Sequence, residues 1–219
     1  MLLVRGTELV EAGPAEVDEL LGGYSRLHVD VGTGDGRVPY ALARSDPESF
    51  YVGLDPAAQN LRETSRRATR KPSRGGVSNV AYVASTAEDP PSELAGRFHE
   101  VSTILPWGKL MVGLIAAAPD VLDGLVRLAR PGARLHVILN GEVWGDPVPI
   151  EARDLPEPTV DYVREVLTPA YAGHGIALGE PRNMTPEAIR RVPSTWARRL
   201  SHGRERPAFV EFEGTFAGR

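Results

Sequence analysis

The stretch that decides the fold is Val29-Asp30-Val31-Gly32-Thr33-Gly34-Asp35-Gly36-Arg37. An apolar run, 25–31, leads into its glycines, and an amphipathic segment, 38–45, follows them. This order predicts a strand, a glycine-rich turn and a helix. Because glycine has no Cβ atom, backbone N–H groups can approach a ligand there, at the positive end of the helix dipole. We therefore expect a polar or anionic ligand group at this loop.

The spacing of the glycines indicates which ligand binds. Gly32-x-Gly34-x-Gly36 differs from the Gly-x-Gly-x-x-Gly of dinucleotide enzymes. Asp30 would repel a pyrophosphate, but it suits an ammonium group or a water that holds one, as in the methionine half of S-adenosylmethionine. Asp55, after the next apolar run, can accept hydrogen bonds from ribose hydroxyls. The alternative is a simple tight turn, with Asp55 capping the helix that begins near Ala57.

Working outward, the pattern of strand, turn and helix repeats along the chain, which predicts an α/β fold with a parallel sheet. The expected strands are 25–31, 49–54, 79–84, 100–105 and 133–140, and the expected helices are 38–45, 57–70, 111–118 and 120–129. Four prolines mark 141–158 as a connector. We expect helices at 159–167 and 186–200, the second interrupted at Val192-Pro193, and a closing antiparallel pair at 176–180 and 207–216.

Composition excludes several classes of protein. The 219 residues, 42% of them hydrophobic, suit one domain over 1–219. The chain has no cysteine, which excludes disulfide scaffolds, zinc ribbons, iron–sulfur clusters and thiol catalysis. Its five histidines lack ligand spacing, so we expect no metal. It shows no membrane-length apolar run and no signal peptide, so we expect a cytoplasmic protein without membrane contact.

Charge is distributed unevenly along a chain with a net charge of −4. Residues 62–74 hold six basic residues against Glu63, and residues 190–206 hold six against Glu205. Charged residues on a helix often simply face solvent and bind no partner. Two arginine-rich stretches in an otherwise acidic chain favour contact with RNA phosphates instead.

Two of the three tryptophans stand in polar loop contexts. Trp107 follows Pro106, and Trp196 lies within the second basic stretch. Both could be core residues. An enzyme that modifies a base must unstack it, however, and an aromatic face replaces the lost stacking at ~1–3 kcal/mol. We expect these tryptophans to stack on a base.

Three motifs carry a resemblance to a known family. Residues 29–37 resemble motif I of the class I S-adenosylmethionine-dependent methyltransferases, and Leu105-Pro106-Trp107-Gly108 stands where that superfamily keeps its substrate-facing motif. With Ser194-Thr195-Trp196-Ala197-Arg198-Arg199-Leu200 and Arg204-x-Arg206, the whole chain resembles the aminoglycoside-resistance 16S rRNA methyltransferases of the Kam/Npm type. Those enzymes methylate N1 of adenine 1408.

The resemblance implies a Rossmann-like fold, with a mostly parallel seven-stranded sheet, helices on both faces and an antiparallel last strand. It implies S-adenosylmethionine as cofactor and a monomer that acts on the 30S subunit, with no DNA partner. Trp107 and Trp196 would hold a flipped adenine as the catalytic residues. Substrate-binding extensions would lie near 62–78, 141–158 and 186–206.

Together with the reading above, the resemblance assigns two sets of binding residues. The expected cofactor contacts are Asp30, Gly32, Thr33, Gly34, Gly36, Asp55, Ala87, Glu88, Leu105 and Ser194. The expected RNA contacts are Arg66, Arg67, Arg70, Lys71, Arg74, Arg153, Arg199, Arg204 and Arg206. Glu88, taken alone, could equally be a solvated acid. Lys109 departs from the small hydroxyl residue of the family.

Three other functions stay open at this point. A small-molecule methyltransferase would share the cofactor loop but would have no use for two arginine-rich stretches. A module that holds the cofactor without turnover is favoured if Trp107 is buried. A nicotinamide-dependent oxidoreductase is disfavoured by the glycine spacing.

Overall fold

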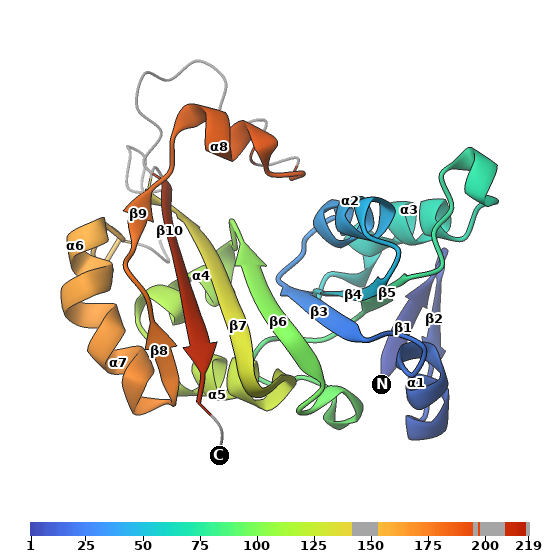
Figure 1. The fold of residues 1–219 in the computed structure, drawn as a ribbon, viewed down its shortest axis with the longest axis horizontal. Helices are drawn as coiled ribbons and strands as arrows, with labels where there is room; N and C mark the ends of the chain where they lie inside the picture. Colours follow the sequence, from blue (N-terminus) through green and yellow to red (C-terminus); the bar gives the residue numbers. More distant parts are fainter. Residues whose placement is uncertain (142–152, 195–196, 198–208, 218–219) are drawn as a thin grey trace.

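A mixed β-sheet with helices on both faces forms the protein (Figure 1). The computed structural model describes residues 1–141, 153–194, 197 and 209–217. The central strands β5 (Val80–Val83), β4 (Ser49–Leu54), β3 (Arg26–Val31), β6 (Phe98–Ile104) and β7 (Ala129–Asn140) are parallel and adjacent in that order. β10 (Phe209–Phe216) lies antiparallel to β7, and β8 (Ile176–Leu178) pairs with β10.

These seven strands confirm the predicted sheet, including its antiparallel last strand. The sheet also extends further than expected. A hairpin of β1 (Leu2–Arg5) and β2 (Glu8–Glu11) adds to the edge at β5, and the two-residue β9 (Arg182–Asn183) pairs with β10. The sequence reading made no prediction for this hairpin.

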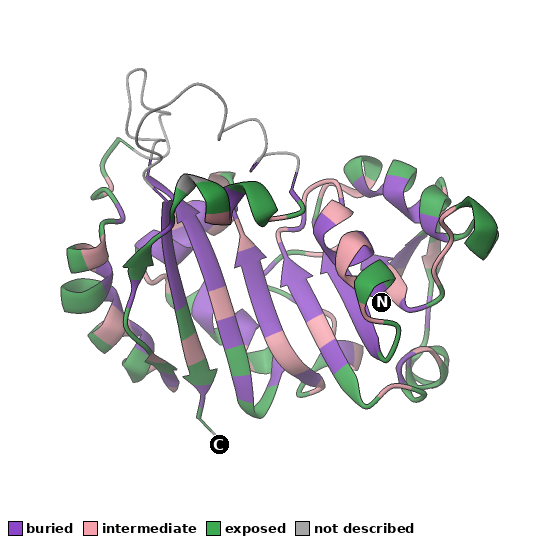
Figure 2. Cartoon of the chain, turned by 45° about the horizontal axis from the view of Figure 1, so that its top comes forward, coloured by how far each residue is buried: buried purple, intermediate pink, exposed green. Residues whose placement is uncertain are grey.

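Two groups of helices cover the sheet, and Figure 2 shows the buried residues concentrated between the layers. On one face, α2 (Arg37–Ser45) and α3 (Ala58–Ala68) pack over β4 and β5. The other face carries α1 (Pro14–Leu21), α4 (Gly108–Ile115), α5 (Pro119–Leu128), α6 (Val160–Tyr162), the single π-helical turn Val163–Leu167 and α7 (Thr168–Gly173). Two 3₁₀ turns, η1 (Pro72–Arg74) and η2 (Ser92–Leu94), lie in the connections.

Side-chain alternation along β3 determines which residues meet each layer. Leu27, Val29 and Val31 join the large apolar core, whereas His28 and Asp30 point to the opposite face. On that opposite face, α8 (Pro186–Arg191) is the one helix, among the described residues, that lies near the ends of β6, β7 and β10. Polar side chains therefore occupy a part of the sheet that helices leave open.

The structure confirms the predicted interruption of the 186–200 helix at Val192-Pro193, and most of 195–200 lies outside the described residues. α8 ends at Arg191 because Val192 adopts an extended conformation (φ −64°, ψ 123°), as the residue before a proline usually does. The connector prediction for 141–158 falls largely on 142–152, outside the described residues. Among the residues that the structure describes, no helix is long and apolar enough to span a membrane.

Candidate active site

A cavity of about 480 Å³ opens at the carboxyl ends of β3, β4, β5 and β6. Ligands of open parallel sheets bind at this edge. It is lined by Gly32, Thr33, Gly34, Asp35, Val38, Leu54, Asp55, Pro56, Asn60, Thr86, Ala87, Glu88, Ile104, Leu105, Trp107, Lys109, Leu110 and Ser194. The structure thus brings together eight of the ten predicted cofactor residues and Trp107. Asp30 and Gly36 do not line the cavity.

The glycine loop has left-handed backbone at Gly34 (φ +62°) and at Gly36 (φ +72°). A Cβ atom on Gly34 would meet no atom within 4 Å, so this glycine leaves the cavity open. A Cβ atom on Gly36 would lie 2.5 Å from the ring of the buried Tyr82, whose hydroxyl donates to the Gly36 carbonyl. Gly34 therefore makes room for a ligand, and Gly36 serves the packing of the loop.

Asp55 braces the loop from the end of β4. Its Oδ2 accepts a 2.9 Å hydrogen bond from the Gly34 N–H, and its Oδ1 accepts one of 2.8 Å from the Ala57 N–H. Asp55 does not cap α3 (Ala58–Ala68), whose N-cap residue is Ala57 and whose first turn has no side-chain cap; its bond to Ala57 closes the turn before the helix. Each carboxylate oxygen keeps a second lone pair for a ligand hydroxyl. Burial raises the pKa of Asp55, and the two backbone donors oppose that rise.

Asp30 lies behind the cavity, where it is 2% exposed. Burial raises its pKa to about 6, while the Ser102 hydroxyl, 2.8 Å from Oδ1, favours the ionised form. The Thr33 hydroxyl also favours the ionised form of Asp30, although it makes no well-aligned hydrogen bond with a described residue. Asp30 is thus placed to act on the cavity through its charge.

The lining of the cavity indicates which ligand fits here. Thr33 belongs to this lining, but its hydroxyl is fully buried and lies toward the Asp30 carboxylate, whose ionised form it favours. With the open space at Gly34 and the carboxylates of Asp55 and Glu88, the site suits a ligand that has ribose hydroxyls and cationic groups.

A strained turn presents Trp107 at the cavity. Leu105 has φ +53°, a costly conformation for a side chain with a Cβ atom, and is held by its N–H, which donates to the Ile138 carbonyl at 2.9 Å. Trp107 follows as the N-cap residue of α4 and is 58% exposed. This exposure removes the observation that would have favoured a non-catalytic binding module.

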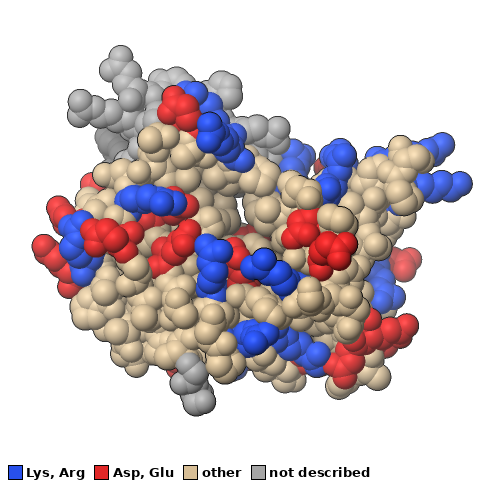
Figure 3. Space-filling view, in the orientation of Figure 1, with Lys and Arg blue, Asp and Glu red and all other residues tan. Residues whose placement is uncertain are grey.

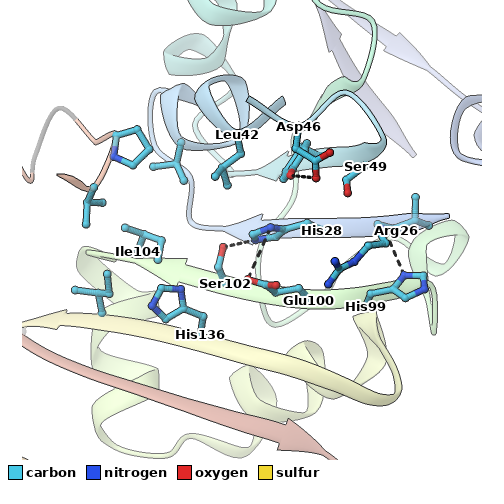
Figure 4. Close-up of a pocket in the computed structure, with 16 residues that line it drawn as sticks. Arg26, His28, Leu42, Asp46, Ser49, His99, Glu100, Ser102, Ile104 and His136 are labelled. Carbon is cyan, nitrogen blue, oxygen red and sulfur yellow. Dashed lines mark hydrogen bonds and ion pairs between the residues drawn. The ribbon is translucent and has the colours of Figure 1, made fainter. Parts of the chain in front are cut away.

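A groove of about 340 Å³ lies on the open face of the sheet (Figure 4). His28, Ser102 and His136 enter it from β3, β6 and β7, and Val38 and Ile104 line both this groove and the cofactor cavity. No described group of three acidic or histidine side chains is arranged to hold a metal ion. Sequence reading missed the groove; polar residues at alternate positions of otherwise buried strands were its signal.

The first basic stretch forms an exposed surface on α3 and η1, where Figure 3 shows Lys and Arg side chains projecting. We call it the basic surface; its members are Arg62, Arg66, Arg67, Arg70, Lys71 and Arg74. None of them forms an ion pair with a described residue, whereas Arg97, Arg127, Arg134, Arg164 and Arg182 elsewhere do. Arg67 packs over the Tyr40 ring, 5.0 Å from its centroid.

Of the remaining predicted residues, one lines the cavity, one lies away from it and four are outside the described residues. Ser194 is 8% exposed and lines the cavity, and its hydroxyl accepts from the Ala197 N–H at 3.5 Å. Arg153 is exposed and does not line the cavity. Trp196, Arg199, Arg204 and Arg206 lie outside the described residues.

Comparison with known proteins identifies the family. The model of the NpmA family, 16S rRNA (adenine(1408)-N(1))-methyltransferase, matches residues 3–214. The chain belongs to this family. It is 37% identical over 218 residues to the 16S rRNA (adenine(1408)-N(1))-methyltransferase of Streptoalloteichus tenebrarius, covering 99% of this chain and 100% of that protein.

Solved structures agree with this membership of the 16S rRNA (adenine(1408)-N(1))-methyltransferase family. The 16S rRNA methyltransferase KamB matches with a TM-score of 0.92 and 37% identity, covering 99% of this chain and 100% of KamB. A variant of the same kind of enzyme from Catenulisporales acidiphilia, solved with the cosubstrate S-adenosylmethionine, matches with a TM-score of 0.91 and 37% identity over 100% of this chain and 97% of that one.

Proposed function

We propose that the protein transfers a methyl group from S-adenosylmethionine to N1 of adenine 1408 in the 16S rRNA of the 30S subunit. The observation that carries this proposal is a cavity that joins the glycine loop, Asp55 and Glu88 to the exposed Trp107. A cell that holds the protein would then resist aminoglycosides, and the protein would act in the cytoplasm as a monomer.

In this proposal the cofactor lies across the strand ends. Asp55 accepts from the ribose hydroxyls, and the backbone at Ala87 with the Glu88 carboxylate meets the adenine edge. Gly34 lets the chain pass close to the methionine half, and the charge of Asp30 favours the cationic groups there. Gly32, Thr33, Leu105 and Ser194 complete the wall of the site.

In this reaction the protein contributes mainly by positioning the cofactor and the target base. When bound, the cofactor supplies a methyl group on a positively charged sulfur. Adenine N1 has its own lone pair, so no general base is needed, which agrees with the lack of a catalytic dyad around the described cavity. Trp107 and Trp196 hold the flipped base in line, and their ring faces stabilise the positive charge that the base gains.

Charged extensions near 62–78, 141–158 and 186–206 bind the subunit. The first contains the basic surface, whose cations lack ion pairs with described residues and so keep their full charge for phosphates. Arg153, Arg199, Arg204 and Arg206 are proposed to add contacts from the other two. Because arginine binds phosphate with a rigid two-pronged group, such contacts also fix orientation.

The test uses purified 30S subunits, tritiated S-adenosylmethionine and mapping of the modified nucleotide. We expect one methyl group per subunit, at N1 of adenine 1408. Label on another nucleotide, or label on small molecules without label on the subunit, would contradict the proposal. Subunits that already carry the methyl group serve as the control and should accept no label.

A further inference from the structure

Lys109 stands in the cofactor cavity at a position to which the family resemblance assigns no lysine. It occupies the first turn of α4, two residues after Trp107. Its neighbour Leu110 packs on the glycine loop, since a Cβ atom on Gly32 would lie 2.4 Å from Leu110 Cδ2. The start of α4 is thereby held against the loop.

The charges around the cavity single out this lysine. Among the described lining residues, Asp35, Asp55 and Glu88 are acidic and Lys109 is the one cation. Arg37 pairs with Asp35 at 3.2 Å, whereas Lys109 makes no ion pair or hydrogen bond with a described residue. Within the described part of the chain, nothing therefore neutralises the ammonium group that Lys109 brings to the cavity.

The sheet order indicates which part of a ligand lies beside Lys109. Asp55 follows β4 and Glu88 follows β5, both on one side of β3, whereas Lys109 follows β6 on the other side. In the proposed function, the ribose and the adenine lie toward Asp55 and Glu88. The methionine half then extends toward β6, and it ends in the only anionic group of the cofactor, the α-carboxylate.

We propose that the Lys109 ammonium binds the α-carboxylate of S-adenosylmethionine. This inference rests on the proposed function, because it needs that cofactor in that orientation. A phosphate of the target nucleotide is the competing anion. Three carboxylates line the same cavity, so a phosphate group would be repelled there more strongly than a zwitterionic amino acid.

Calorimetry with two probes isolates the contact. The first probe is S-adenosylhomocysteine, and the second is its decarboxylated analogue, in which hydrogen replaces the carboxylate. Lys109→Met keeps the apolar stem and removes the charge. We expect it to weaken binding of S-adenosylhomocysteine by roughly 10- to 150-fold, the range for a hydrogen bond between charged groups, and to leave binding of the analogue within about twofold.

Two further variants serve as controls. Lys109→Arg should retain most of the affinity, because it keeps the charge. Arg44→Met removes an exposed cation on α2 that does not line the cavity, and it should leave the affinity for both probes unchanged. Because Lys109 is exposed, its variants should unfold at the wild-type temperature.

The outcomes separate this proposal from its rivals. Equal loss for both probes, or no loss for either, would overturn it. A Lys109→Met protein that binds S-adenosylhomocysteine normally but binds 30S subunits with a smaller salt dependence would assign the lysine to phosphate. If the wild type binds the cofactor and loses affinity as expected in Lys109→Met, yet methylates no subunit, the proposed function fails and the lysine contact stands.

Discussion

The Ser102 hydroxyl donates a 2.8 Å hydrogen bond to Oδ1 of Asp30, and the same hydroxyl oxygen lies 2.9 Å from Nε2 of His28. Because the serine proton serves the carboxylate, His28 must donate its Nε2–H to Ser102. Burial lowers the pKa of His28 to about 4, so the ring is neutral at pH 7. A chain of hydrogen bonds thus joins the open groove (Figure 4) to the carboxylate behind the cofactor loop.

Replacing Asp30 by Asn should stabilise the protein and weaken cofactor binding. The folded-state pKa of about 6 lies above the ordinary 3.8, so the ionised group opposes folding above pH 6 and costs nothing below pH 3.8. The difference corresponds to about 3 kcal/mol above pH 7. Denaturant unfolding should show a gain of up to that size at pH 8 and little at pH 4. A destabilised Asp30→Asn protein at pH 8 would contradict the assignment.

Ser102→Ala should move the pH dependence of cofactor binding. Ionised Asp30 favours the cationic end of the cofactor, so affinity should fall as the pH drops below about 6. Removing the Ser102 donor disfavours the ionised form and shifts this fall to a higher pH. Thr33, Asp55 and His136 also face the carboxylate and stay unchanged. Calorimetry between pH 5 and 8 measures the midpoint, and Ser102→Thr, which restores a hydroxyl, should return it toward the wild-type value.

Alanine at Gly34 and at Gly36 should have different effects. Both positions are left-handed, which costs an alanine roughly 1–2 kcal/mol. Gly34→Ala meets open space, so the fold should survive while the methyl group enters the cofactor cavity and abolishes binding. Gly36→Ala clashes with Tyr82 and should lower the unfolding temperature further. Circular dichroism and calorimetry on the pair check this; cofactor affinity retained by Gly34→Ala would place the ligand elsewhere.

Reversing Arg66, Arg67 and Arg70 to Glu should weaken binding to 30S subunits and leave cofactor affinity unchanged. Each phosphate contact contributes a slope of roughly −0.7 to −0.9 in log K against log salt, so the slope should become shallower. Filter binding at several salt concentrations measures it. Arg44→Glu, an exposed reversal on α2 away from the basic surface, is the matched control. An unaltered slope in the triple variant would show that these arginines are merely solvated.

Trp107→Ala and Trp196→Ala should lower the rate of methyl transfer more than they lower subunit affinity. Loss of one stacking face at ~1–3 kcal/mol predicts roughly a five- to 150-fold fall in rate. Trp107 is 58% exposed, so its removal should leave the unfolding temperature nearly unchanged. Single-turnover transfer is measured beside filter binding, and phenylalanine variants should keep part of the rate. Wild-type rates in both alanine variants would exclude the base-stacking role.

The cofactor loop could be predicted from sequence because its determinants are local. Left-handed backbone at Gly34 favours glycine, and Asp55, at the end of the next strand, accepts a hydrogen bond from the Gly34 N–H. The surroundings of Asp30, by contrast, could not be predicted from local sequence. Asp30 is near the loop in sequence, but strand alternation turns it onto the open face of the sheet, where Ser102, 72 residues away, determines its surroundings.

Other features depended on contacts that a single sequence does not reveal. The groove needs His28, Ser102 and His136 from strands whose neighbours are set by the sheet order, and the sequence shows each as an isolated polar residue. The hairpin of β1 and β2 has four-residue strands, too short for a periodic signal. Its place in the sheet comes from pairing of Leu3 with Val83 on β5.

The lining of the cofactor cavity is concentrated in one part of the chain. Within the described residues, every lining group except Ser194 comes from 32–110, whereas two of the three proposed RNA-binding extensions lie beyond residue 140. In the proposed function, the donor site therefore comes almost wholly from 32–110, while the target contacts are divided between that segment, which holds Trp107 and the basic surface, and the segments beyond residue 140. Under that proposal, substitutions beyond residue 140 would alter binding to the subunit and, Ser194 apart, would leave the described donor site unchanged.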